Sequence, residues 1–84
     1  MTNKIILESL ASDLKRVALG LHRGSNNMAE RFLEEALKRK SEVNTSDTAP
    51  YINTLLMKID KNIDSEDALM YSTLIQNYTQ KVVK

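Results

Sequence analysis

The chain of 84 residues contains no cysteine, a single histidine, one proline and two glycines. The absence of cysteine excludes disulfides and thiolate metal sites, and a single histidine leaves too few ligands for a zinc site. The low proline and glycine content, beside 42% apolar residues, indicates an ordered and mainly helical domain. We therefore expect one domain with no metal and no cofactor.

Long apolar runs and an excess of either charge are also missing. No run of about 18 apolar residues occurs, so no transmembrane helix is expected. The N-terminal MTNKIILESL is interrupted by Glu8 and lacks the apolar region of a secretory signal. Twelve basic and 11 acidic residues give a formal charge of +1, which offers little general attraction for phosphate backbones. These absences predict a cytoplasmic protein that does not enter the membrane.

Apolar residues recur at steps of three and four through most of the chain, as on one face of a helix. We predict four helices, at residues 3–22, 26–42, 50–62 and 65–83. The main core positions would be Leu7, Leu10, Leu14, Val17, Leu21, Ile52, Leu55, Leu56, Ile59, Ile63, Ala68, Tyr71, Leu74, Ile75, Tyr78 and Val82. Because the connections at residues 24 and 64 are short, neighbouring helices should be antiparallel. The expected fold is a single all-α domain, an up-down antiparallel four-helix bundle that dimerisation could complete.

Polar residues before each later helix supply candidate caps. Ser25, Asn26 and Asn27 are all good caps for the second helix, and Asn27 followed three residues later by Glu30 resembles a capping box. Asp47 or Thr48 would cap the third helix, which has a proline in its first turn. Asp64 or Ser65 would cap the fourth helix.

The second helix has an unusually wide apolar arc, with Met28 at one edge and Leu37 at the other. Apolar residues also fall roughly opposite the buried stripes of the other helices, at Ile5, Leu19, Met57 and Leu69. Gathered on one surface, such side chains mark a protein partner or a dimer contact. We expect a non-enzymatic interaction or regulatory module that forms a homodimer. Its partner-binding residues would be Met28, Phe32, Leu33, Leu37, Leu19, Met57 and Leu69.

A nucleic-acid-binding regulator is the alternative from another class. Gly20 and Gly24 have the spacing of small residues found in helix-turn-helix turns. However, Glu30 occupies a position where the recognition helix should bury an apolar residue. If this alternative held, the phosphate contacts would come from Arg23, Lys38, Arg39 and Lys40.

The segment from Asp60 to Asp64 places acidic or amide oxygens at the first, third and fifth positions, as an EF-hand loop does. The loop then fails, because Ser65 stands where glycine is needed and Tyr71 where a bidentate glutamate is needed. Acidic residues at the start of a helix are favoured by the helix dipole. We therefore expect these residues to begin the fourth helix.

His22 is the one candidate for phosphotransfer, since histidine phosphotransfer domains are small helical bundles with an exposed histidine. In those domains a glycine follows the histidine by four residues, whereas Gly24 follows His22 by two. A histidine in a last helical turn complements the helix C-terminus, and Gly24 can end that helix in the left-handed conformation. No phosphate-binding loop or nucleophile elbow is present, so no catalytic residue is expected.

Overall fold

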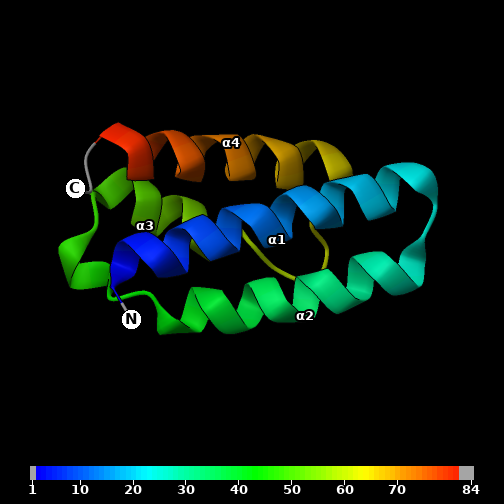
Figure 1. Cartoon of the computed structure of the whole chain (residues 1–84), viewed down its shortest axis with the longest axis horizontal. Helices are drawn as coiled ribbons and strands as arrows, with labels where there is room; N and C mark the ends of the chain where they lie inside the picture. Colours follow the sequence, from blue (N-terminus) through cyan, green and yellow to red (C-terminus); the bar gives the residue numbers. More distant parts are fainter. Residues whose placement is uncertain (1, 82–84) are drawn as a thin grey trace.

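The computed structural model describes residues 2–81, and the regular secondary structure in that range is helical (Figure 1). The elements in order are α1 (Asn3–Arg23), α2 (Asn26–Glu42), the short 3-10 helix η1 (Thr45–Asp47), α3 (Pro50–Met57) and α4 (Ser65–Lys81). The molecule measures 35 × 19 × 19 Å along its principal axes. The prediction of an all-α fold with four α-helices is confirmed.

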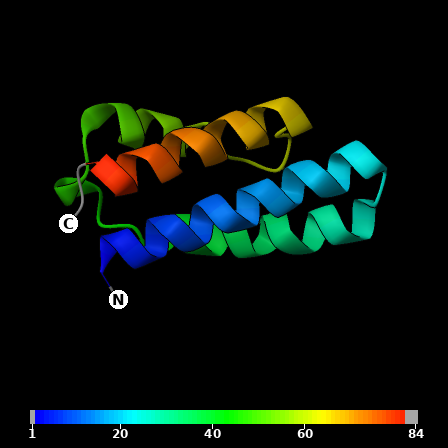
Figure 2. The same ribbon diagram turned by 45° about the horizontal axis from the view of Figure 1, so that its top comes forward.

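The central helix is α1, which lies between α2 and α4 and packs closely against both (Figures 1 and 2). Both neighbours run in the direction opposite to α1. At the contact with α2, a Cβ atom added to Gly20 would stand 3.0 Å from the backbone nitrogen of Ala29. At the contact with α4, the Ser72 hydroxyl donates to the Ala11 carbonyl oxygen at 2.7 Å. Small residues therefore allow both helices to approach α1 closely.

Both ends of α1 are capped. The Thr2 hydroxyl oxygen accepts a hydrogen bond from the Ile5 N–H at 3.4 Å. At the other end Gly24 adopts a left-handed φ of 74°, and the Ser25 N–H donates to the Gly20 carbonyl oxygen at 2.8 Å. The predicted helix stop at Gly24 is confirmed.

The bounds predicted for the second helix, residues 26–42, are confirmed by α2. Ser25, one of the three predicted caps, is the N-terminal cap residue, although its side chain makes no capping hydrogen bond. The predicted capping box between Asn27 and Glu30 is wrong, because Asn27 lies inside the first turn instead of before it. The α1–α2 hairpin is fixed by the Ser25 bond to Gly20 and by the close contact of Gly20 with α2.

The third helix is shorter than predicted, because α3 ends at Met57 instead of continuing to residue 62. The Lys58 N–H donates to the Leu55 carbonyl oxygen at 3.0 Å, which tightens the last turn. Farther on, an Asp60 carboxylate oxygen accepts from the Asn62 N–H at 2.8 Å and stabilises a turn. Local hydrogen bonds from the backbone and from Asp60 thus replace the expected helix.

The predicted caps of α3 are also wrong. Asp47 belongs to η1, and the Thr48 hydroxyl donates to the side-chain carbonyl of Asn53. The cap residue is Ala49, whose N–H donates to the Tyr78 hydroxyl at 3.1 Å. A long-range bond to α4 therefore holds the N-terminus of α3.

The start of α4 is as predicted, since an Asp64 carboxylate oxygen accepts from the Asp67 N–H at 2.7 Å. The prediction that Leu74 is buried is wrong, because that side chain is 41% exposed. The polar Ser72 faces α1 in the buried part of the interface. Val82, predicted as a core residue near the end of this helix, lies outside the described residues. The buried side chains of α4 are Ala68, Tyr71, Ser72, Ile75, Tyr78 and Thr79.

Candidate functional site

A surface groove lies between α2 and residues 58–64, the segment that joins α3 to α4. Two adjoining hollows of about 170 and 280 Å³ form it, and Glu30, Leu33 and Lys61 line both of them. Its apolar lining is completed by Val17, Leu21, Ala29, Leu37 and Ile63. We call this surface the α2 groove.

The opposite wall of the α2 groove is held in place by Lys40. The Lys40 ammonium donates to the Ile59 carbonyl oxygen at 2.9 Å, which tethers segment 58–64 to the C-terminal part of α2. Ile59 and Ile63 are both buried, so the segment is also anchored in the core. In residues 2–81, α1 is the only helix that packs closely against α2. The groove exists because a turn, and not a long α3, faces α2.

The rim of the α2 groove carries charges of both signs. Glu30 and Glu34 are exposed on α2, and Lys61 is exposed on segment 58–64. None of these three residues takes part in an ion pair within residues 2–81. The rim can therefore offer carboxylates and an ammonium group to a partner without breaking an internal pair.

The predicted partner residues of α2 do not form one surface. Phe32, Leu33 and Leu37 are half-buried and pack against the core. Arg16 of α1 lies over the Phe32 ring, 5.3 Å from its centroid. Met28 is half-buried and lies nine residues before Leu37, which puts the two on opposite sides of the helix at about 100° per residue. Only Leu33 and Leu37 reach the α2 groove.

The structure brings together two other predicted residues, Leu19 and Leu69. They are 41% and 52% exposed and line a hollow of about 410 Å³ between α1 and α4. Lys15 and His22 lie on the same hollow. Met57 is 80% exposed and lines none of the hollows described here.

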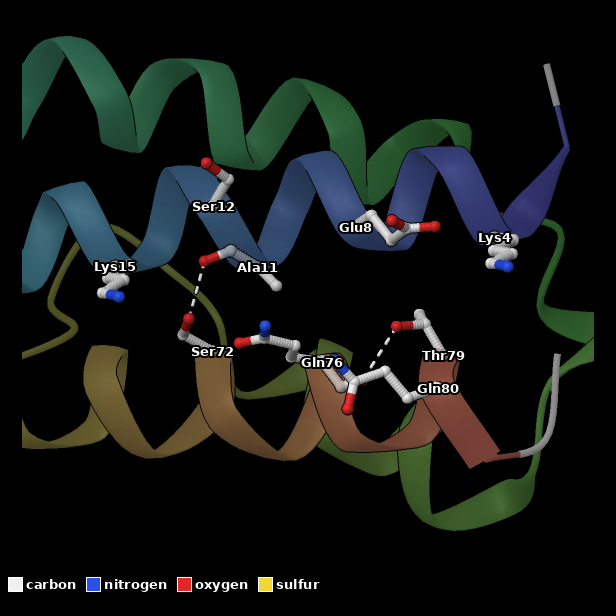
Figure 3. A pocket seen from close by; sticks show the side chains of 9 residues that line it. All are labelled: Lys4, Glu8, Ala11, Ser12, Lys15, Ser72, Gln76, Thr79 and Gln80. Carbon is white, nitrogen blue, oxygen red and sulfur yellow. Dashed lines mark hydrogen bonds between the residues drawn. The ribbon is translucent and has the colours of Figure 1, made fainter.

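A larger polar groove of about 510 Å³, which the sequence did not predict, continues along α1 and α4 (Figure 3). Lys4, Glu8 and Lys15 of α1 line one side, and Gln76 and Gln80 of α4 line the other. The sequence does show polar residues beside the buried stripe of each helix. It does not show which helices pack together, so it cannot predict which two rows of polar residues face each other across a groove.

The basic residues of the nucleic-acid alternative are dispersed. Arg23 ends α1, whereas Lys38 lies in the C-terminal part of α2, on the order of 20 Å away along that helix at 1.5 Å per residue. Arg39 forms an ion pair within its own helix at 3.3 Å. Lys40 is bonded to the Ile59 carbonyl oxygen. Only Arg23 and Lys38 are exposed, and they lie far apart.

The acidic residues of the EF-hand-like segment have structural partners. Asp60 accepts from the Asn62 N–H and Asp64 accepts from the Asp67 N–H. Among residues 2–81, no group of three or more histidine, cysteine, aspartate or glutamate side chains could hold a metal ion. His22 is exposed in the last turn of α1.

A half-buried carboxylate, that of Asp13, lies on α1 within electrostatic reach of Arg39 on α2. The Asp13 side chain is 14% exposed, and the Arg16 guanidinium is 4.0 Å from it. Burial raises the pKa of Asp13 above its ordinary value of 3.8, although the positive charges of Arg39 and Arg16 lower it part of the way.

No protein-family model matches the chain, and neither the curated proteins nor the solved structures include a match. Within residues 2–81, no helix is both long and apolar enough to cross a membrane.

Proposed function

We propose that the chain is a small, non-enzymatic interaction or regulatory module of the cytoplasm that binds a protein partner in the α2 groove and self-associates as a homodimer. The observation that supports this is the apolar lining of Leu33 and Leu37 beneath unpaired charges at the rim. Grooves of this kind accept the apolar face of an amphipathic helix.

The chemistry of the α2 groove defines the partner segment. Leu33 and Leu37 are one helical turn apart. A partner helix would therefore contact them with two apolar side chains that are also one turn apart, at its positions i and i+3 or i+4. A basic residue beside them would meet Glu30 and Glu34. An acidic residue would meet Lys61 across the groove.

Self-association agrees with the size and shape of the domain. A core in a chain of fewer than about 80 residues rarely contributes more than about 3–5 kcal/mol, and 84 residues lie near that bound. The two-turn α3 also covers less apolar surface than a full-length third helix would. In this proposal the chain forms an up-down four-helix bundle, and a second copy adds buried apolar surface to its small core.

The test of partner binding is capture from a cell extract on immobilised protein, followed by direct titration of the captured protein. The variant is Leu37→Ser, and the matched control is Leu74→Ser, which removes a leucine of α4 outside the groove. The captured protein should bind wild type and the control equally and should bind Leu37→Ser at least tenfold more weakly. Because Leu37 also packs on the core, circular dichroism must show that the variant is folded.

A variant of the charged rim separates loss of partner binding from loss of folding. Glu34→Lys with Lys61→Glu changes two exposed groups and leaves the core unaltered. Loss of binding in this variant supports the α2 groove as the site. Equal binding of one captured protein by wild type, Leu37→Ser and the rim variant would rule the groove out.

A further inference from the structure

The side of α1 that faces away from the core carries a strip of three residues at seven-residue spacing, Ile5, Ser12 and Leu19. Ile5 is 48% exposed and Leu19 is 41% exposed, and Ser12 lies midway between them. Seven residues are close to two helical turns, so the three positions are aligned along about 21 Å of helix. We call this the α1 strip.

The two flanks of the α1 strip differ in charge. Glu8 and Lys15 lie on the flank toward α4, where Figure 3 shows both side chains at the polar groove. Neither forms an ion pair within residues 2–81. On the other flank Arg16 donates to the Ser12 hydroxyl at 3.0 Å and lies over Phe32. The flank toward α4 therefore carries Lys4, Glu8 and Lys15 without an ion pair in the described residues, and the other flank carries Arg16, which is already held.

We propose that a second copy of the chain packs its α1 strip antiparallel against this one, with a two-fold axis beside Ser12. Ile5 of each copy then meets Leu19 of the other, because both are seven residues from Ser12. Glu8 meets Lys15 of the other copy on the same flank, and the symmetry makes this pair twice. The inference rests on the self-association proposed above and assigns it a face that is separate from the α2 groove.

Charge favours the antiparallel arrangement over the parallel one. In a parallel pair, opposite flanks meet at the same height, so Lys15 would lie beside Arg16 of the other copy. Such a like-charge contact is unfavourable. In the antiparallel pair the two Arg16 guanidinium groups, each held at Ser12 and over Phe32, lie on one side of the axis, and the two Glu8–Lys15 pairs lie on the other.

The surface beside the α1 strip suits a contact between two helical domains. Ser12 is small, so two helices can approach closely at the axis. Leu69 of α4 shares a hollow with Leu19 and extends the apolar surface on the flank of Glu8 and Lys15. The contact would therefore cover three of the exposed large apolar side chains of the chain, Ile5, Leu19 and Leu69.

Sedimentation equilibrium of charge variants tests the assignment. Because each change affects two symmetric pairs, Glu8→Lys and Lys15→Glu should each raise the dimer dissociation constant about tenfold, as expected for like charges placed opposite each other. The double variant should return to within about threefold of wild type, because the pair is restored with its signs exchanged. The control Glu34→Lys alters the rim of the α2 groove and should leave the dimer unchanged.

A second measurement uses the absence of cysteine in the chain. Ser12→Cys places two thiols beside the two-fold axis, where a disulfide can form, and mild oxidation should give a covalent dimer. Ser41→Cys, an exposed position on α2, is the control and should stay uncoupled. A dimer that is insensitive to the charge variants and uncoupled in Ser12→Cys overturns this inference alone. A wild-type chain that is monomeric at all concentrations overturns the self-association as well, while partner binding in the α2 groove would still be testable.

Discussion

The α1–α2 hairpin and the chain from residue 43 to residue 64 reach the same core by different means. In the hairpin, two long helices are joined by Gly24 and Ser25, and Gly20 brings their backbones into contact. In the later segment, η1, the two-turn α3 and a turn are held by side chains from distant parts of the sequence. Tyr78 and Lys40 supply two of these bonds.

This difference determines where the surface is open. Regular helices bury a continuous stripe, so the hairpin leaves only its outward side and its charged face to solvent. The turn after α3 buries Ile59 and Ile63 but has no continuous face to lay against α2. The α2 groove is the result, and changes in the two regions should therefore have different consequences.

The largest effect should come from Ile59→Ala in the turn. Ile59 is fully buried, and removing its side chain from the core should cost about 2–5 kcal/mol of unfolding free energy. Met57→Ala, two residues earlier and 80% exposed, is the control and should change the stability by less than about 0.5 kcal/mol. Urea denaturation measures both. A small effect of Ile59→Ala would mean that the turn contributes little to the core, contrary to the view that the hairpin and the turn share it.

The hairpin is tested by Gly20→Ala. The new methyl group would stand 3.0–3.1 Å from backbone and side-chain atoms of Ala29, and such overpacking costs about 1–3 kcal/mol. Replacing glycine inside a helix recovers about 0.5–1 kcal/mol, so a net loss of up to about 2.5 kcal/mol is expected. Thermal and urea unfolding should both show it. A more stable variant would show that the backbones of α1 and α2 can separate without loss.

The sequence predicted the hairpin well because its determinants are local. The stop at Gly24 and the apolar stripe of α1 depend on residues within two turns of each other. The end of α3 was missed, because Ile59 and Ile63 keep helical spacing even though they lie in a turn. The spacing of apolar residues alone cannot distinguish a helix from a turn here, because the hydrogen bonds that end the helix come from Lys58 and Asp60.

The residues of the candidate sites could likewise be predicted only in part from the sequence. Leu33 and Leu37 could be selected from the wide arc of α2, yet Lys61 across the groove could not, since it reaches α2 only through the turn. Leu19 and Leu69 could each be placed off a buried stripe. Their meeting in one hollow depends on α4 packing against α1, which periodicity does not specify.

A smaller effect is expected from Tyr78→Phe, which removes the long-range bond at the start of α3. The Tyr78 ring also packs edge-on against Tyr51 at a centroid distance of 5.8 Å, and that contact remains in the variant. Loss of the hydroxyl bond to the Ala49 N–H should cost roughly 0.5–1.5 kcal/mol. Hydrogen exchange should accelerate in residues 49–57 and stay unchanged in α1. Equal acceleration in both regions would show that α3 and the hairpin unfold as one unit.

The smallest effect concerns the pH dependence of the α1–α2 contact. Burial raises the pKa of Asp13 in the folded chain above 3.8, so the folded state binds its proton more tightly than the unfolded state does. The stabilisation of the folded state by protonated Asp13 is fully present below pH 3.8 and is lost as the pH rises through the raised pKa of the folded state. The unfolding free energy of wild type relative to Asp13→Asn should therefore fall over that window and stay constant above it, as urea titrations at a series of pH values can measure. If the difference rises with pH instead, the attraction of Arg39 and Arg16 outweighs burial, and the carboxylate stabilises the hairpin when charged.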